Sequence, residues 1–295
     1  MASTVLGMNT AQIAALTTTQ IVALSSSDMA ALNTAQVAAL TTDQVAAIET
    51  RDIIGLTTAG IVALSTANVA ALTTDQIGVL TTTQIAALET TDVAVLTTDQ
   101  IIALSSAQIA VLKTMQVAAL TTAQVAAIET GDLTALSTAG IVALNTADVA
   151  ALTTDQIGAL KTSQVVALES RDVAVLTTDQ IITLSSAQVA VLTTGQVGAL
   201  TTAQVAAIET GDLTALSTAG VVALNTADVV ALTTDQIGVL TTNQVKALVS
   251  RDVAVLTTDQ IVALSTAQVA ALTTVQVGAL TTAQIAALET ADIGV

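Results

Sequence analysis

Paired carboxylates recur at a fixed spacing along this chain, and they are the residues best suited to chemistry. A Glu stands three residues before an Asp in a slot that returns every forty residues, except that one slot has Val249 in place of Glu and keeps Asp252. Carboxylate oxygens suit Ca²⁺, and pairs stacked one coil apart would form a line of ligands. The sequence therefore predicts a candidate cation ladder made of Glu49, Asp52, Glu89, Asp92, Glu129, Asp132, Glu169, Asp172, Glu209, Asp212, Glu289 and Asp292.

The same carboxylates have a second interpretation that needs no metal. An Asp near a helix N-terminus is stabilised by the helix dipole, and Arg51, Arg171 and Arg251 each precede the Asp of their slot. The Gly-Gly-x-Gly-x-Asp nonapeptide, a stronger calcium signature, is absent from the sequence. Both interpretations stay open from the sequence, and Ca²⁺ is the only cofactor that it suggests.

Catalysis is not expected of this chain. The sequence has no Cys and no His, so it lacks a thiolate nucleophile and the usual general base. A glycosidase-like carboxylate pair needs one distinct cleft, whereas here the same pair repeats along the whole chain. Glycine-rich phosphate loops are also absent. We therefore predict that the protein is not an enzyme.

An eight-residue repeat must position these carboxylates, and Leu72–Val79 (LTTDQIGV) is typical of it. A continuous helix does not fit, because eight residues overshoot two turns by roughly 80° and the Leu stripe would spiral. A strand would put Leu72 and Ile77 on opposite faces. One short helix per octad fits, since Thr73 and Gln76 have capping-box spacing and Leu72 and Ile77 can form a hydrophobic staple. Either Thr73 or Thr74 could be the N-cap.

These octads predict a single all-α solenoid over residues 1–295, with a Thr/Ser corner between short helices. Longer repeats of forty and eighty residues overlie the octad, and Gly60, Gly140 and Gly220 recur at eighty. Forty residues are five octads, so we expect about five octads per coil. Leu and Val or Ile are expected inward, and Thr, Gln and Asp outward. A β-solenoid is the alternative, because Val, Ile and Thr favour strands.

Charge and hydropathy restrict the partners. A formal charge of −17 opposes binding to nucleic acid and to anionic membranes. No apolar run approaches the roughly 20 residues that span a bilayer, so membrane insertion is not expected. No N-terminal signal peptide is evident. Because Cys-free chains are common among secreted bacterial proteins, an extracellular or cell-surface location is favoured.

The first and last octads look like all the others, without the polar capping units that solenoids normally carry. Uncapped ends favour another copy of the chain as the partner. We therefore expect a homo-oligomer or filament that forms through these ends.

The sequence resembles known proteins in two ways. Leu40 to Ile48 (LTTDQVAAI) resembles the opening helix of TAL effector repeats, but the base-reading loop has no counterpart here and DNA binding is not implied. The whole chain is similar to Thr/Ala/Gln/Val-rich short-repeat tracts of large bacterial surface and secreted proteins. That resemblance implies stalks, adhesin spacers or fibre subunits and brings no site residues with it.

The sequence thus favours a structural repeat protein, either a self-assembling extracellular filament subunit or a surface stalk. The alternative is an adhesin-like binding module whose repeated surface recognises Ca²⁺, a polysaccharide or a partner protein.

Overall fold

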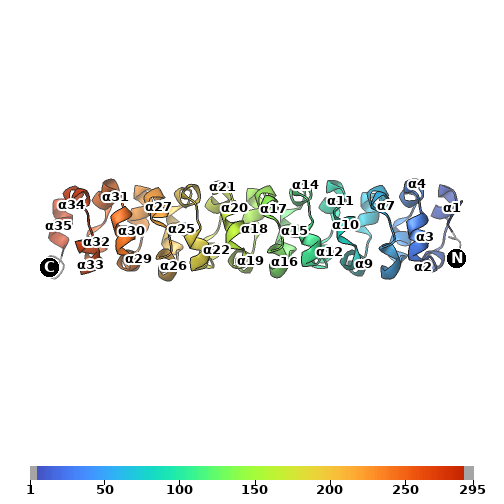
Figure 1. Ribbon diagram of the computed structural model, residues 1–295, viewed down its shortest axis with the longest axis horizontal. Coiled ribbons are helices and arrows are strands. Elements are labelled where there is room, and N and C mark those ends of the chain that lie inside the picture. The colour runs from blue at the N-terminus through green and yellow to red at the C-terminus, as the bar shows by residue number, and fades with distance from the viewer. Residues whose placement is uncertain (1–4, 289–295) are drawn as a thin grey trace. The chain divides into compact units, whose positions relative to one another are not determined.

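The computed structural model describes residues 5–288 and divides the chain into two compact units, Met1–Ala151 and Leu152–Val295. Within each unit, short helices wind one after another into a stack of coils (Figure 1). No strand occurs among residues 5–288. The predicted all-α solenoid is therefore confirmed, and the β-solenoid alternative is wrong.

Each helix occupies one octad and spans four to six residues. Unit 1 contains α1 (Thr10–Ala14), α2 (Thr18–Val22), α3 (Ser26–Ala31), α4 (Thr34–Ala38), α5 (Thr42–Ala47), α6 (Thr50–Ile53), α7 (Thr58–Ala63), α8 (Thr66–Ala70), α9 (Thr74–Val79), α10 (Thr82–Ile85), α11 (Thr90–Val95), α12 (Thr98–Ile102), α13 (Ser106–Ala110), α14 (Thr114–Val117), α15 (Thr122–Ala127), α16 (Thr130–Leu133), α17 (Thr138–Ala143) and α18 (Thr146–Ala151). Unit 2 contains α19 (Thr154–Ala159), α20 (Thr162–Ala167), α21 (Ser170–Ala174), α22 (Thr178–Ile182), α23 (Ser186–Ala190), α24 (Thr194–Gly198), α25 (Thr202–Ala207), α26 (Thr210–Leu213), α27 (Thr218–Ala223), α28 (Thr226–Ala231), α29 (Thr234–Val239), α30 (Thr242–Ala247), α31 (Ser250–Val255), α32 (Thr258–Val262), α33 (Thr266–Ala270), α34 (Thr274–Ala279) and α35 (Thr282–Ala287).

The start of each helix follows from the capping box, as α9 shows. Thr73 has an extended backbone, and its hydroxyl accepts a hydrogen bond from the Gln76 backbone N–H at 3.1 Å. In return the Gln76 side-chain oxygen Oε1 accepts from the Thr73 N–H at 2.8 Å. Two of the unpaired N–H groups at the helix start are thereby satisfied.

The first of the two polar residues is the N-cap, which settles the choice left open by the sequence. The position holds even where the side chain cannot cap, as at Glu49, Lys113 and Val249. At Lys113 the backbone N–H still donates to Gln116 Oε1 at 2.8 Å. The following Thr or Ser is the first helical residue.

The core is formed by the two apolar positions of the octad, as predicted. Leu72 and Ile77 are buried, and the same holds for their counterparts through most of the described chain. Helices this short are unstable alone in water, so the free energy of folding must come mainly from stacking between octads.

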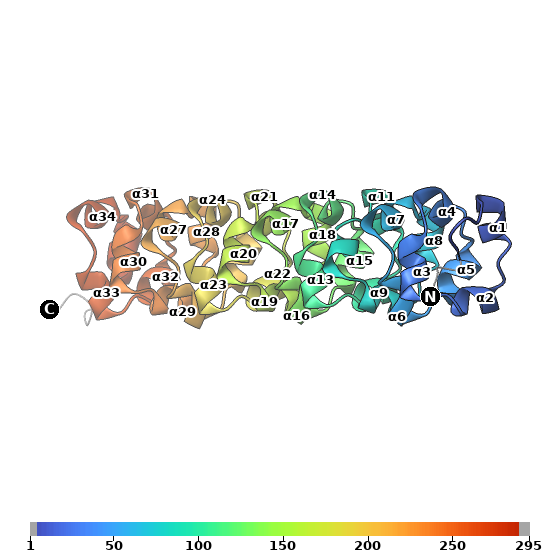
Figure 2. The same cartoon turned by 45° about the vertical axis from the view of Figure 1, so that its right-hand side comes forward.

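Each helix packs against the helix three octads away, for example α6 on α9 and α24 on α27 (Figure 2). Side-chain hydrogen bonds reach backbone carbonyls 28 and 31 residues earlier. A coil therefore closes after more than three and fewer than four octads, and the expectation of five octads per coil is wrong. The forty-residue period is therefore a feature of the sequence and does not correspond to one coil.

Candidate functional site

A buried glutamine connects each coil to the one before it, and we call this side chain a rung. Gln76 is fully buried in α9. Its oxygen caps its own helix, while its amide nitrogen Nε2 donates to Ile48 O at 2.6 Å and Val45 O at 2.9 Å. These carbonyls lie at the end of α5, so one side chain satisfies groups at a helix start and at a helix end.

The same two bonds, to carbonyls 28 and 31 residues earlier, recur in both units. They are made by Gln36, Gln44, Gln84, Gln100, Gln108, Gln116, Gln124, Gln188, Gln196, Gln204, Gln236, Gln244, Gln260, Gln268, Gln276 and Gln284.

The expectation that Gln faces outward is therefore wrong. The local sequence predicts the hydrogen bond of the glutamine oxygen, because that bond caps the glutamine's own helix. The acceptors of the amide nitrogen lie in the preceding coil, and the local sequence does not reveal them. A signal was present in the sequence, because the residue just before the rung varies from octad to octad, as Asp75 and Ala123 show. The next residue is Gln in both octads, at Gln76 and Gln124.

The predicted acidic slots turn out to be capping positions. Glu49, Glu89, Glu129, Glu169 and Glu209 are N-cap residues, and the Asp three residues later takes the place of the rung. Asp92 and Asp172 are buried and accept a backbone hydrogen bond from Glu89 at 3.2 Å and Glu169 at 3.1 Å. Burial raises the pKa of both aspartates, although these hydrogen bonds oppose the shift.

Several other carboxylates of the slots have partners of their own. Asp132 and Asp212 accept hydrogen bonds from the hydroxyls of Ser106 and Ser186, which lie 26 residues earlier. Arg51 pairs with both carboxylates of its slot, reaching Asp52 at 3.2 Å. Arg171 does the same with Glu169 and Asp172. Glu289 and Asp292 lie outside the described residues.

Within each unit the slots do not stack on one another. They lie five octads apart, in α6, α11, α16, α21 and α26, whereas packing joins helices three octads apart. Residues 5–288 contain no group of three or more acidic side chains that could hold a metal ion. The calcium ladder remains a prediction without a gathered set of ligands in the part of the chain that is described.

Comparison with known protein families matches repeated segments along the chain. Residues 21–47, 45–82, 85–122, 125–162, 165–202, 205–242, 237–266 and 253–290 match the family model of the ALTTAQ repeat. The chain belongs to the ALTTAQ repeat family. A search of curated proteins gives no match.

The letters that name the ALTTAQ repeat have a direct structural meaning in this chain. They occur at residues 119–124, 199–204 and 279–284. In the first of these, Leu120 is a core residue, Thr121 is the N-cap and Gln124 is the rung. The motif therefore spans one corner, from the end of one helix to the rung of the next.

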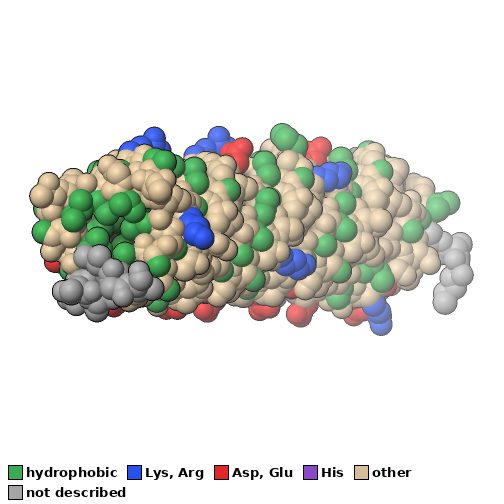
Figure 3. Space-filling view, turned by 60° about the vertical axis from the view of Figure 1, so that its left-hand side comes forward, with side chains coloured by type: hydrophobic (Ala, Val, Ile, Leu, Met, Phe, Trp, Pro, Cys, Tyr) green, Lys and Arg blue, Asp and Glu red, His purple; other side chains and the backbone are tan. Residues whose placement is uncertain are grey.

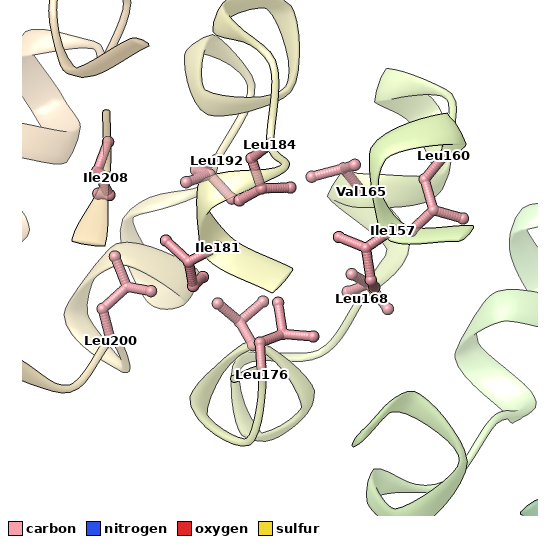
Figure 4. Close-up of a pocket in the computed structure, with 11 residues that line it drawn as sticks. Ile157, Leu160, Val165, Leu168, Leu176, Ile181, Leu184, Leu192, Leu200 and Ile208 are labelled. Carbon is pink, nitrogen blue, oxygen red and sulfur yellow. The ribbon is translucent and has the colours of Figure 1, made fainter. Parts of the chain in front are cut away.

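Apolar side chains fill the interior of the ALTTAQ repeats in the region that Figure 4 shows. In unit 2, Ile157, Leu160, Leu176, Ile181 and Leu200 are among the side chains that line a cavity of about 10 Å³ (Figure 4). A cavity of that size is at the lower limit for a single water, and its lining has no polar group to hold one. No helix within residues 5–288 is both long and apolar enough to cross a membrane.

In three helices the rung position holds glycine and not glutamine. These glycines are Gly60 in α7, Gly140 in α17 and Gly220 in α27. A Cβ at Gly140 would make ordinary contacts, the nearest at 3.4 Å to Ser137 Oγ, whereas a Cβ at Gly220 would lie 2.8 Å from Leu216 Cδ1. We expect Gly140→Ala to raise the free energy of unfolding by about 0.5–1 kcal/mol, because Ala restricts the unfolded chain. Gly220→Ala should gain less, because the leucine must move.

Urea unfolding of the two variants checks this expectation. An equal gain at both positions would show that the contact with Leu216 carries no cost.

Proposed function

We propose that the protein is a structural repeat protein, a non-enzymatic spacer or filament subunit whose copies associate end to end outside the cell. The observation that carries the proposal is the system of rungs. In the outermost described coils, amide donors and core side chains that are satisfied or buried elsewhere in the stack are exposed. Within residues 5–288, the Nε2 groups of Gln12 and Gln20 have no acceptor, and the core side chains of Val277 and Ile285 are about half exposed. A second copy supplies what each of these coils lacks.

The first described coil of unit 1 presents amide donors. Gln12 and Gln20 are exposed. Their oxygens cap their own helices, but their Nε2 groups donate to no atom among the described residues. An apolar hollow lies beside Gln20, which lines it together with Val5, Met8 and Leu16. This surface offers hydrogen-bond donors around an apolar centre.

The last described coil of unit 2 presents the complementary groups. Val277 and Ile285 are 49% and 52% exposed, whereas Val253 and Ile261, at the same octad position three octads earlier, are fully buried. Hydrophobic side chains gather on this end in the space-filling view (Figure 3). In the proposed contact, the carbonyls of Leu272 and Leu280, at the ends of their octads, are the acceptors for the glutamine amides of the second copy.

Location outside the cell rests on composition alone. A chain without Cys needs no control of its redox state, and a Thr-rich, acidic surface suits a spacer that must stay soluble. The similarity to short-repeat tracts of bacterial surface proteins supports the same proposal.

A matched pair of variants on α34 tests the end-to-end contact. Val277 lies at the core position, and Val275, 69% exposed, lies two residues earlier on the side of the same helix. We expect the wild-type chain to form concentration-dependent polymers in sedimentation velocity and electron microscopy. Val277→Lys should weaken association at least about tenfold, because a charge would be buried against the apolar hollow, and Val275→Lys should leave it unchanged.

Two results would contradict the proposal. One is a wild-type chain that stays monomeric at every concentration with a helical circular dichroism spectrum. The other is an equal loss of association in both lysine variants, which would indicate contact through the sides.

A further inference from the structure

Buried aspartates also stand at the rung position outside the acidic slots, and two of them are Asp148 in α18 and Asp228 in α28. Each caps its own helix by accepting a hydrogen bond at 3.1 Å, from the N–H of Asn145 or of Asn225. The other oxygen of Asp148, Oδ1, is buried without a hydrogen-bond partner. In a glutamine rung this end of the side chain donates to the preceding coil.

Asn68 shows that a side chain of this length reaches the preceding coil. It has the rung position in α8, and its Nδ2 donates to Leu40 O, 28 residues earlier, at 3.0 Å. A protonated aspartate has the shape of asparagine and one O–H donor. The carbonyls at the same register are those of Leu120 for Asp148 and Leu200 for Asp228, each 28 residues earlier in the chain.

In the charged state the geometry is unfavourable. A carboxylate accepts hydrogen bonds and cannot donate them, so neither aspartate can bond to a carbonyl of the preceding coil while it is charged. We propose that Asp148 and Asp228 are proton-operated rungs, which bond to the preceding coil when their carboxyl groups are protonated and lose that bond when they are charged.

The neighbouring helices do little to compensate these charges. Residues 122–127 of α15 pack against α18, and residues 202–207 of α25 pack against α28, and neither segment contains a titratable residue. On its other side α28 packs against α31, which brings Arg251 and Asp252. Arg251 Nε lies 3.6 Å from Asp252 Oδ1 as an ion pair. The charge of Arg251 is therefore already paired with the carboxylate beside it.

The direction of the pH effect follows from these surroundings. Burial raises the pKa of Asp148 and of Asp228 above the ordinary value of 3.8, against the opposing hydrogen bonds from Asn145 and Asn225. The folded state therefore binds these protons at a higher pH than the unfolded chain does. The contribution of these two groups to stability therefore rises as the pH falls from neutrality through the raised pKa values, and this gain is complete below the unfolded value near 4.

Replacing both aspartates by asparagine tests the proposal in the full-length chain. Asp148→Asn/Asp228→Asn should fold more tightly at pH 7, with the folding equilibrium constant raised at least about fivefold, because two buried charges are removed. Its stability should also change less between pH 7 and pH 4 than that of the wild type. Urea unfolding followed by circular dichroism at each pH measures both effects.

The control removes the same number of charges from the surface. Asp75 and Asp235 are exposed and lie one residue before the rungs of α9 and α29. Asp75→Asn/Asp235→Asn should keep the pH dependence of the wild type, which separates the buried rungs from the general relief of negative charge in acid.

The reverse substitution creates a proton-operated rung where none exists. Asn68→Asp should lower the folding equilibrium constant at pH 7 at least about fivefold and recover it near pH 4, where the new carboxyl group is protonated. The proposal is overturned if Asp148→Asn/Asp228→Asn is less stable than the wild type at pH 7. It is equally overturned if Asn68→Asp shows no pH-dependent loss.

Discussion

Gln76→Met is expected to lower the free energy of unfolding by about 3 kcal/mol, because buried polar groups that lose their partner cost roughly 1–3 kcal/mol each. Methionine nearly preserves the volume, so the loss isolates the hydrogen bonds of the rung. The Ile48 carbonyl and the Thr73 N–H both lose the partner that Gln76 supplies, and Val45 O loses one of two donors. Urea unfolding measures the difference in stability, and the dependence of the free energy of unfolding on urea concentration should be the same in both proteins.

Gln12→Met is the matched control for this prediction. Gln12 caps α1 by accepting from the Asn9 N–H at 2.9 Å, but its amide nitrogen donates to no described residue. In the unassociated chain its replacement removes the cap alone and should cost about 1 kcal/mol or less. If both variants lose the same stability, the bonds between coils contribute nothing beyond the cap.

Ile77→Ala is expected to lower the free energy of unfolding by about 3 kcal/mol, within the range for truncation of a buried aliphatic side chain. Ile77 is fully buried, and the short helix α9 cannot collapse around the cavity without moving the rung beside it. Its backbone carbonyl, which accepts the rung of Gln108 at 2.8 Å, is unaffected by the substitution. The measured loss therefore reports packing of the core.

Val79→Ala, two residues later on the same helix, provides the comparison. Val79 is 42% exposed, and its truncation should change stability by no more than about 0.5 kcal/mol. Thermal and urea unfolding of both variants measure the contrast. Equal losses would mean that the side-facing position is as important to the core as the inward one, contrary to the packing described above.

The local part of the fold was readable from the sequence. Thr73 and Gln76 are three residues apart, and Leu72 and Ile77 are five apart, so the cap and the staple involve atoms that the chain itself holds close together. The same reasoning placed Leu72 and Ile77 in the core, and the exclusion of a continuous helix was correct for the same geometric reason. Short helices joined at Thr/Ser corners followed directly.

The number of octads in a coil was not readable, because it depends on the bend at each corner. Small changes in the backbone of an N-cap such as Thr73 accumulate around the coil and decide which octads become neighbours. The forty-residue period, which also separates the starts of five consecutive ALTTAQ matches from residue 45 to residue 205, gave the wrong neighbours for the acidic slots.

The octad, the short helices, the apolar core and the candidate carboxylates all follow from the residues of a single repeat and their spacing. Packing between coils fixes the rest: Gln76 and its equivalents turn inward, Asn68 makes a shorter rung, and Asp148 has a buried oxygen with no partner. Distance along the chain explains the difference. The acceptors of these side chains lie 28 to 31 residues away, and no interaction within a single octad specifies them.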